Sequence, residues 1–378
     1  MPEAYVEPMT ESLVSGVSSV RCFKCLKLAT VSKCGGCHAI GYCGRECQKA
    51  DRPRHKWNCL PVMVTEFPGK GRGLVAARDI KMGELIFKDK PTFKVTLDSF
   101  GLPDFDSLKK QIEKLPIEAQ RQFYKLEPTK DTTISCLING NGSKELKILM
   151  NNGSDHGDEW LLHLNVALLN HSCAPNAFVG SLMPLESKNL EVRAVKDISR
   201  GEEVTICYLL DGQNIGSMAQ RRTLLRLEHA ISDCKCGLCS GDIPDPEAHV
   251  QEFQRIFGFL KFFGHDNLYQ KKLSHWKKEA KVIEKVLDFF PQMYITTVED
   301  KYKAYECVAE FAQMARDPVL LEKAMTTWKR LAEDTKLEQV TREHEHMKEK
   351  LAQWSAQFKS NKPPKKAEID FFELHLRK

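Results

Sequence analysis

The sequence predicts an α+β protein with several domains: a metal-binding N-terminal module, a β-rich central domain and an α-helical C-terminal domain. The first observation is that seven of the 14 cysteines crowd between Cys22 and Cys59. The second is a series of glycine-punctuated, β-type runs between residues 66 and 208, and the third is helical spacing of apolar residues beyond Pro244. With 378 residues, 42% hydrophobic and 28% charged, the chain has room for two or three compact domains.

The expected domain boundaries follow the changes in composition. They are a mobile tail over 1–20, a cysteine-rich module over 21–60, a β-rich domain with a cysteine motif at its end over 61–241, a helical domain over 242–358, and a linker and tail over 359–378. No apolar run approaches the roughly 20 residues that a membrane span requires, and the first residues lack the basic and apolar regions of a secretory signal. We therefore expect a protein of the cytoplasm and nucleus with no membrane partner.

The net charge of +5 does not identify a partner. It counts every thiol as neutral, whereas eleven cysteines bound as thiolates to three zinc ions would cancel it. Nine basic residues against two acidic ones between Arg21 and Cys59 favour only salt-sensitive, non-specific contact with DNA. We expect no sequence-specific binding of nucleic acid.

The first cysteine cluster has the spacing of a zinc-binding module. It offers eight ligands for two tetrahedral ions, in the order Cys22-x-x-Cys25, Cys34-x-x-Cys37, Cys43-x-x-x-Cys47 and His55-x-x-x-Cys59. Two intervening residues let a turn aim both sulfurs at one ion, and three place both on one face of a helix turn. His38 follows Cys37 directly, but eight ligands already fill two sites, so we expect it not to bind zinc. Free thiols at this spacing are the weaker interpretation.

A second cysteine cluster, Cys234-x-Cys236-x-x-Cys239, supplies three thiolates. A structural zinc site normally has four protein ligands, so the fourth must come from elsewhere in the chain. The two clusters together indicate three zinc ions.

Several segments carry signals of secondary structure. The pattern Asp-Ile-x-x-Gly-Glu occurs at residues 79–84 and 197–202 between β-type flanks, and we expect two similar hairpins. Residues 104–127 and the apolar run 160–169 are expected to be helical, and Asn-Gly-Asn-Gly at 139–142 is typical of a hairpin turn. Two sets of residues recur at helical spacing and are expected to face a core: Val250, Phe253, Phe257 and Leu260, and Tyr302, Tyr305, Val308 and Phe311.

Three further motifs lie in the β-rich region. They are Gly69-Lys70-Gly71-Arg72-Gly73, Asn170-His171-Ser172-Cys173, and Gly201-Glu202-Glu203-Val204-Thr205-Ile206-Cys207-Tyr208. The first lacks the spacing of a Walker A sequence, and as GxGxxG it fails because Ala76 occupies the third glycine position. Alternating glycines instead let a backbone approach a ligand closely. Each motif by itself also has a purely structural interpretation. The glycine motif fits a solvated basic turn, the Asn-His pair fits a helix cap or turn, and Tyr208 fits a core or rim residue.

Together these motifs resemble a SET domain, and the motif at 234–239 resembles the post-SET zinc motif that follows it. The first cysteine cluster resembles a MYND zinc finger. The combination, over about residues 21–241, resembles the SMYD family of protein lysine methyltransferases. The resemblance implies S-adenosylmethionine as cofactor and transfer of its methyl group to the ε-amine of a lysine in a protein substrate, histone or non-histone.

The resemblance also implies roles for individual residues. It pairs Cys22, Cys25, Cys43 and Cys47 on one zinc ion and Cys34, Cys37, His55 and Cys59 on the other, and it makes Cys173 the fourth ligand beside Cys234, Cys236 and Cys239. It places the loop Lys70, Gly71, Arg72 and Gly73 around the cofactor, with the two basic side chains near its carboxylate end. Asn170 and His171 contact its amino and adenine groups, and Tyr208, in the cofactor site and catalytic, faces the methyl group in transit.

Three features depart from the family pattern. The finger precedes Gly69, whereas typical members insert it within the SET domain, so the order resembles divergent invertebrate members. Arg52-Pro53 stands where the family usually has an aromatic residue, which we expect to loosen a partner-binding surface. Ser232 stands where relatives often carry an aromatic residue that closes the cofactor pocket and lysine channel. The absence of this aromatic residue has several possible consequences: weaker cofactor binding, an altered degree of methylation or a degenerate enzyme. Alternatively, Ile231 or a residue from the tail compensates for it.

A function of another class stays open beside methyl transfer. In it the chain is a non-catalytic adaptor or transcriptional co-regulator whose finger binds proline-containing peptides while the SET fold serves as scaffold. Both functions predict zinc. They differ in whether the chain binds the cofactor and transfers a methyl group.

Overall fold

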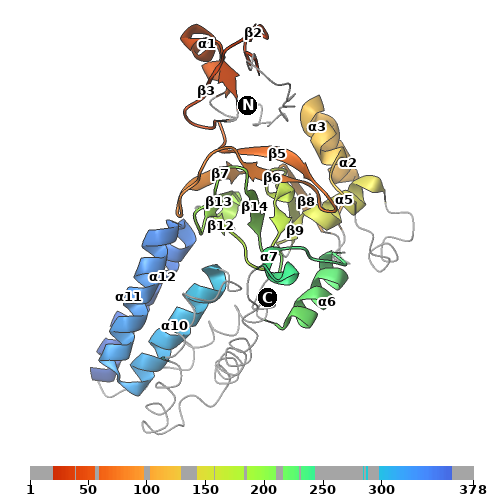
Figure 1. Cartoon of the computed structure of the whole chain (residues 1–378). Helices are drawn as coiled ribbons and strands as arrows, with labels where there is room; N and C mark the ends of the chain where they lie inside the picture. The colour runs from red at the N-terminus through yellow and green to blue at the C-terminus, as the bar shows by residue number, and fades with distance from the viewer. Residues whose placement is uncertain are drawn as a thin grey trace. The chain divides into compact units, whose positions relative to one another are not determined.

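The structure is a computed structural model of the whole chain (Figure 1). It describes residues 20–38, 40–55, 59–97, 103–128, 143–156, 158–182, 185–209, 216–229, 231–242, 284, 287 and 298–359. The chain folds into two compact units. The first consists of Met1–Tyr208 and Leu225–Cys234, and the second consists of Leu209–Leu224 and Lys235–Lys378. None of the described helices is both long and apolar enough to cross a membrane. The turn expected at 139–142 and the helical spacing expected from Val250 to Leu260 lie outside the described residues.

The cysteine-rich module is built from two short antiparallel strand pairs and one helix. Its elements are β1 (Val20–Arg21) with β2 (Leu28–Ala29), β3 (Ser32–Lys33) with β4 (Gly41–Tyr42), and α1 (Arg45–His55). Half of the residues buried in its small core are cysteines: Cys22, Cys34, Cys37, Ile40, Tyr42 and Ala77. A core of this size and composition cannot hold the chain alone, so the module depends on what the cysteines bind.

Within the described ranges, the β-rich domain contains three sheets, whose strands Figure 1 shows. Its strands are β5 (Val62–Phe67), β6 (Gly71–Ala76), β7 (Leu85–Asp89), β8 (Phe93–Thr96), β9 (Ser154–Asp155), β10 (Glu159–Leu162), β11 (Asn170–His171), β12 (Ala177–Ser181), β13 (Leu190–Ala194) and β14 (Glu203–Ile206). The strand orders are β8-β10-β9, β11-β14-β6-β5 and β12-β13-β7. Apolar side chains from all three sheets bury one core, among them Phe93, Leu162, Val192 and Val204.

The helices of this domain differ from the sequence prediction in two places. Residues 104–127 form two helices, α2 (Phe105–Lys114) and α3 (Ile117–Tyr124), because Pro116 disfavours the helical conformation at Leu115, which is extended at ψ 151°. The helix predicted over 160–169 is wrong. That run holds strand β10 and the short 3-10 helix η1 (Val166–Leu168), since its first residues pair with β8. The remaining elements are α5 (Lys144–Asn152) and the 3-10 helix η2 (Leu185–Ser187).

A buried aspartate explains why the chain turns at η1. The Asp89 carboxylate accepts hydrogen bonds from the backbone N–H groups of Asn165 and Val166, each at 3.0 Å, and from the Asn165 amide at 3.2 Å. These donors are orphaned at the start of a helix and need an acceptor. Asp89 therefore sets where η1 begins and thus where strand β11 starts, two residues after η1 ends.

The two Asp-Ile-x-x-Gly-Glu segments, residues 79–84 and 197–202, are not hairpins. Each one carries the chain between the four-stranded sheet and the sheet β12-β13-β7, and the strands on its two sides pair with other strands. Ile80 and Ile198, both buried, exchange two backbone hydrogen bonds of 2.9 and 2.8 Å. Each aspartate accepts from the backbone of the other segment: Arg200 N to Asp79 Oδ1 at 2.8 Å and Met82 N to Asp197 Oδ1 at 2.9 Å. We call this reciprocal pair the crossed turns.

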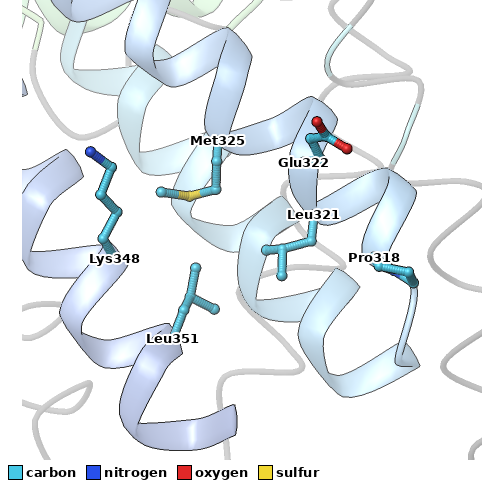
Figure 2. A pocket seen from close by; sticks show the side chains of 6 residues that line it. All are labelled: Pro318, Leu321, Glu322, Met325, Lys348 and Leu351. Carbon is cyan, nitrogen blue, oxygen red and sulfur yellow. The ribbon is translucent and has the colours of Figure 1, made fainter.

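The C-terminal region is helical, as predicted, in the part that the structure describes. The helices of this region are α10 (Val298–Ala315), α11 (Pro318–Thr335) and α12 (Glu338–Lys359). Helices α6 (Met218–His229) and α7 (Gly237–Ser240) lie before residue 242, where the sequence predicts that the helical region begins. The aromatic stripe faces a core, since Tyr302 and Tyr305 are buried and Tyr302 stacks on buried Trp328. Figure 2 shows an open groove between α11 and α12, lined by Pro318, Leu321, Glu322, Met325, Lys348 and Leu351.

His163 links the stability of this fold to pH. Its ring is buried, with Nε2 2.9 Å from the carbonyl oxygen of Lys188, and burial lowers the pKa of His163 below its ordinary value of 6.5. A neutral ring is therefore favoured in the folded state, and stability falls as the pH drops below about 6.5. We expect urea unfolding of His163→Gln to lose less stability than the wild type between neutral pH and about pH 5.5. Equal losses in the two proteins would contradict this, because both carry the same zinc ligands.

Candidate functional site

The four-stranded sheet brings the three motifs of the β-rich domain together. Gly71–Ala76 forms β6, Glu203–Ile206 forms β14 beside it, and Asn170–His171 forms β11 on the far side of β14. Strand β14 pairs antiparallel with β6 and parallel with β11. The strands β6 and β11 are far apart in the sequence, yet a single strand separates them in the sheet.

Tyr208 lies two residues after the end of β14, and its hydroxyl group is a hydrogen-bond donor. The phenol donates to the carbonyl oxygen of Leu169 at 2.6 Å. Burial, with a smaller contribution from the Glu203 carboxylate, raises the pKa of Tyr208 well above its ordinary value of 10. The hydroxyl therefore keeps its proton at neutral pH, and its oxygen is left as an acceptor towards any further group.

His171 joins Tyr208 to the second cysteine cluster. The backbone N–H of Tyr208 donates to His171 Nδ1 at 3.0 Å, so Nδ1 carries no proton and the neutral ring has its proton on Nε2. That nitrogen lies 3.3 Å from the Cys173 sulfur. A hydrogen bond from the ring to a thiolate orients a metal ligand and adjusts its charge.

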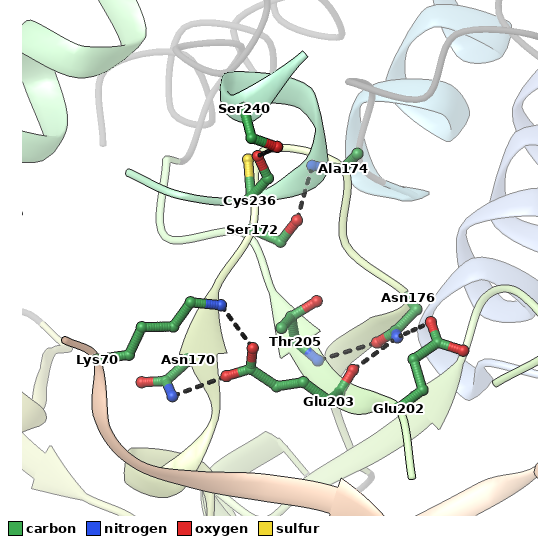
Figure 3. A network of polar contacts seen from close by, with 10 residues as sticks. All are labelled: Lys70, Asn170, Ser172, Ala174, Asn176, Glu202, Glu203, Thr205, Cys236 and Ser240. Atoms are coloured by element: carbon green, nitrogen blue, oxygen red, sulfur yellow. Dashed lines mark hydrogen bonds and ion pairs between the residues drawn. The ribbon is translucent and has the colours of Figure 1, made fainter. Parts of the chain in front are cut away.

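Lys70, Asn170 and Glu203 form a polar network on the same sheet (Figure 3). Glu203 accepts from Lys70 Nζ at 2.6 Å and from Asn170 Nδ2 at 2.9 Å. Gly73 lets the Asn170 amide lie against β6, because a Cβ at position 73 would stand 2.5 Å from Asn170 Nδ2. Gly71 has φ +75°, in the left-handed region that favours glycine. Arg72 is half-buried and paired in register with Glu66 of β5.

The first cysteine cluster has the geometry of two tetrahedral zinc sites. Its ligand atoms form two groups, and within each group they all lie within 4.8 Å of one another. The first group is Cys22, Cys25, Cys43 and Cys47, and the second is Cys34, Cys37, His55 and Cys59. With Zn–S bonds of about 2.3 Å, sulfurs at tetrahedral corners lie about 3.8 Å apart. The measured separations are 3.7 Å for Cys25 and Cys43 and 3.6 Å for Cys43 and Cys47.

The histidine of the second group fits the same test. A nitrogen and a sulfur on one tetrahedral zinc ion lie about 3.6 Å apart, and His55 Nε2 is 3.6 Å from the Cys37 sulfur and 3.3 Å from the Cys34 sulfur. His38 is exposed and belongs to neither group. The interleaved pairing that the MYND resemblance implies is therefore the one that the structure brings together.

The third group holds the four remaining predicted ligands. Sulfurs of Cys173, Cys234, Cys236 and Cys239 lie within 4.8 Å of one another, and all four residues are buried. The group consists of four buried cysteines and includes no histidine or carboxylate. Four protein ligands are typical of a structural zinc site, whereas a catalytic zinc site leaves one coordination position open for water or substrate. The residues therefore fit three zinc ions.

Two residues of the site escaped the sequence prediction. Glu203 binds both Lys70 and Asn170, and the ring of His229, the last residue of α6, lies 5.2 Å from the Tyr208 ring. Ser232, where relatives often carry an aromatic residue, is exposed. A ring thus does lie against Tyr208, five residues before Cys234, and the sequence signal that could have found it is a histidine near the expected aromatic position.

Comparison with known proteins agrees with this geometry. Residues 22–59 match the MYND finger family and residues 71–209 match the SET domain family. N-lysine methyltransferase SMYD2 of Homo sapiens is 32% identical over 193 aligned positions, which cover 47% of this chain and 42% of that protein. Histone-lysine N-methyltransferase SMYD3 of Homo sapiens is 26% identical, covering 72% and 63%, and histone-lysine N-methyltransferase ASHR1 of Arabidopsis thaliana is 27% identical, covering 59% and 47%.

The chain spans about half the length of the curated relatives that it matches. Both matched families fall where the fold places the cysteine-rich module and the four-stranded sheet, and the first ends before the second begins. This chain therefore carries a MYND finger followed by a SET domain, and it is similar in sequence to SMYD lysine methyltransferases.

Proposed function

We propose that the chain transfers a methyl group from S-adenosylmethionine to the ε-amine of a lysine in a protein substrate. The observation that carries the proposal is the placement of Gly71–Gly73, Asn170–His171 and the segment ending at Tyr208 on neighbouring strands of one sheet. Support also comes from relatives that are named lysine methyltransferases.

The residues present suit the cofactor. Lys70 offers a cation for its carboxylate and Asn170 an amide for its amino group, and Gly73 leaves the room that the Asn170 amide needs beside β6. The cofactor, when bound, supplies a methyl group activated on a sulfonium. We assign Lys70, Gly71, Arg72, Gly73, Asn170, His171 and Tyr208 to its site.

The chemistry requires a neutral amine, and no residue of the chain has to act as a strong base. Deprotonating a lysine with a pKa of about 10.4 at pH 7 costs roughly 4.6 kcal/mol. An apolar channel and a nearby positive charge lower that cost by disfavouring the ammonium form. The phenol of Tyr208 donates to Leu169 and keeps its proton, so its oxygen acts as an acceptor that orients the incoming amine.

A second candidate function concerns the MYND finger alone. Three apolar side chains of the finger are exposed: Val20, Leu26 at 63% and Leu28 at 62%. Arg52 and Pro53 lie exposed on α1. Such a surface suits an adaptor that binds a proline-containing peptide, and it is compatible with methyl transfer by the SET domain of the same chain.

The test measures cofactor binding and methyl transfer with the purified chain. We expect a dissociation constant for S-adenosylhomocysteine in the micromolar range or below, and transfer of labelled methyl from S-adenosylmethionine to lysines in a protein mixture, located by mass spectrometry. A zinc-loaded, folded chain that binds no cofactor would overturn the proposal and leave the adaptor function.

A further inference from the structure

Glu203 is the centre of the polar network that Figure 3 shows. Its two carboxylate oxygens bind different partners: Oε2 accepts from Lys70 Nζ at 2.6 Å and Oε1 accepts from Asn170 Nδ2 at 2.9 Å. The partners come from the loop before β6 and from β11, on opposite sides of β14. The Glu203 side chain is 14% exposed and that of Lys70 29%, so the carboxylate is sheltered from solvent while the lysine is accessible.

The carboxylate fixes which way the Asn170 amide faces. An ionised carboxylate can only accept hydrogen bonds, so the amide must turn its NH₂ group to Glu203 and its oxygen away. Gly73 confines the amide from the side of β6, since a Cβ there would stand 2.5 Å from Nδ2. Among the described residues, no donor reaches the Asn170 oxygen, which leaves it as an acceptor for a bound ammonium group.

The same carboxylate balances the charge of Lys70. An ammonium group has three donors, so Lys70 can hold Glu203 and still donate to a second acceptor. The network then offers one donor with positive charge and one amide acceptor, with no net charge of its own. This pattern complements the α-amino acid end of a ligand, where a carboxylate and an ammonium stand on one carbon.

We propose that Glu203 is the positioning residue of an amino-acid subsite in this sheet. It turns the Asn170 oxygen towards the ligand ammonium and keeps the positive charge of Lys70 from repelling that group. The inference rests on the proposed function, because the ligand with such an end is the S-adenosyl cofactor. The inference adds Glu203 to the residues of the cofactor site. It also predicts that Glu203 affects the binding of the cofactor's amino-acid end and leaves the binding of its adenosine end unchanged.

The neighbouring residue offers a matched control. Glu202 accepts from Asn176 Nδ2 at 3.0 Å, so it too binds an asparagine amide, and Figure 3 shows the two pairs side by side. Asn176 in turn binds the backbone of β14, through its oxygen to Thr205 N at 2.9 Å. Asn176 Nδ2 also donates to the Glu203 backbone oxygen at 2.9 Å, so the Glu202 pair supports the strand, and in the described residues it makes no hydrogen bond to the Lys70 or Asn170 side chain.

The experiment compares two ligands that differ only at the amino-acid end. S-adenosylhomocysteine carries it and methylthioadenosine lacks it. In Glu203→Gln, an NH₂ group replaces one of the two carboxylate oxygens and cannot accept from the donor that stands there, and Lys70 keeps an unbalanced charge. We expect calorimetry to show that Glu203→Gln binds S-adenosylhomocysteine about tenfold to a hundredfold more weakly than wild type, with methylthioadenosine affinity within about twofold. Glu202→Gln should bind both ligands as wild type does.

Other outcomes separate this inference from the proposed function. Equal weakening of both ligands by Glu203→Gln, or no change for S-adenosylhomocysteine, would overturn the positioning role. A wild-type chain that binds neither ligand would overturn the proposed function itself. If Glu203→Gln does not fold with its zinc ions, Glu203→Asp answers the question, since it keeps the charge but is too short for both contacts. It should weaken S-adenosylhomocysteine selectively and by less, and equal weakening of the two ligands would again count against the inference.

Discussion

Replacing His55 by asparagine is expected to release one of the three zinc ions and to unfold the MYND finger. His55 Nε2 stands at ligand distance from two sulfurs of its group, and the core around them consists largely of cysteines. Apparent binding energies of structural zinc are about 10–16 kcal/mol, which exceeds what so small a core supplies. Native mass spectrometry should find two zinc ions per chain, and limited proteolysis should cut between residues 20 and 60.

His38→Asn is the matched control for this prediction. The residue is a histidine of the same finger, exposed and outside both ligand groups, and its φ of +57° is one that asparagine adopts more readily than most residues. This variant should keep three zinc ions and resist proteolysis. Retention of three ions by His55→Asn, or loss of one by His38→Asn, would show that the ligand assignment is incorrect.

Tyr208→Phe is expected to lower the rate constant of methyl transfer by about a hundredfold or more. The substitution removes the oxygen that, in the proposed mechanism, orients the amine, and it leaves the Leu169 carbonyl without its donor. The aromatic ring keeps its packing against His171 and His229. Single-turnover transfer of labelled methyl should therefore fall much further than the affinity for S-adenosylhomocysteine.

Tyr124→Phe controls for the loss of a phenol as such. Tyr124 is exposed on α3, and its hydroxyl donates to Glu145 at 3.1 Å, away from the three motifs. This variant should transfer methyl at the wild-type rate. If Tyr208→Phe does the same, Tyr208 has no part in the reaction. If Tyr208→Phe loses ligand affinity as much as activity, its role is structural.

The zinc ligands could be predicted from sequence because their geometry is local. A turn or a single helical turn brings Cys22 to Cys25 or Cys43 to Cys47, so spacing alone indicates which residues share an ion within each pair. Which two pairs share one zinc ion depends on contacts between distant segments, and only the family resemblance predicted it. The same holds for Cys173, which lies far in sequence from the three cysteines with which it is grouped.

Other features depend on neighbours that the sequence does not reveal. Glu203 follows an identical residue in the chain, and only its position on β14, between β6 and β11, gives it contacts with Lys70 and Asn170. The apolar run 160–169 fits a helix or a buried strand equally well. Pairing with β8 and the carboxylate of Asp89, distant along the chain, decide between them.

The crossed turns bear on how this protein emerges from the ribosome. Strand β6 receives its second neighbour only when β14 has been synthesised, and the hydrogen bonds between the two turns can form only then. Until then the nascent chain carries an open β-edge, which can pair with another chain. A translation product that stops before Glu203 keeps that edge permanently. Premature termination between the two turns should therefore yield aggregates and chaperone clients rather than a smaller working domain.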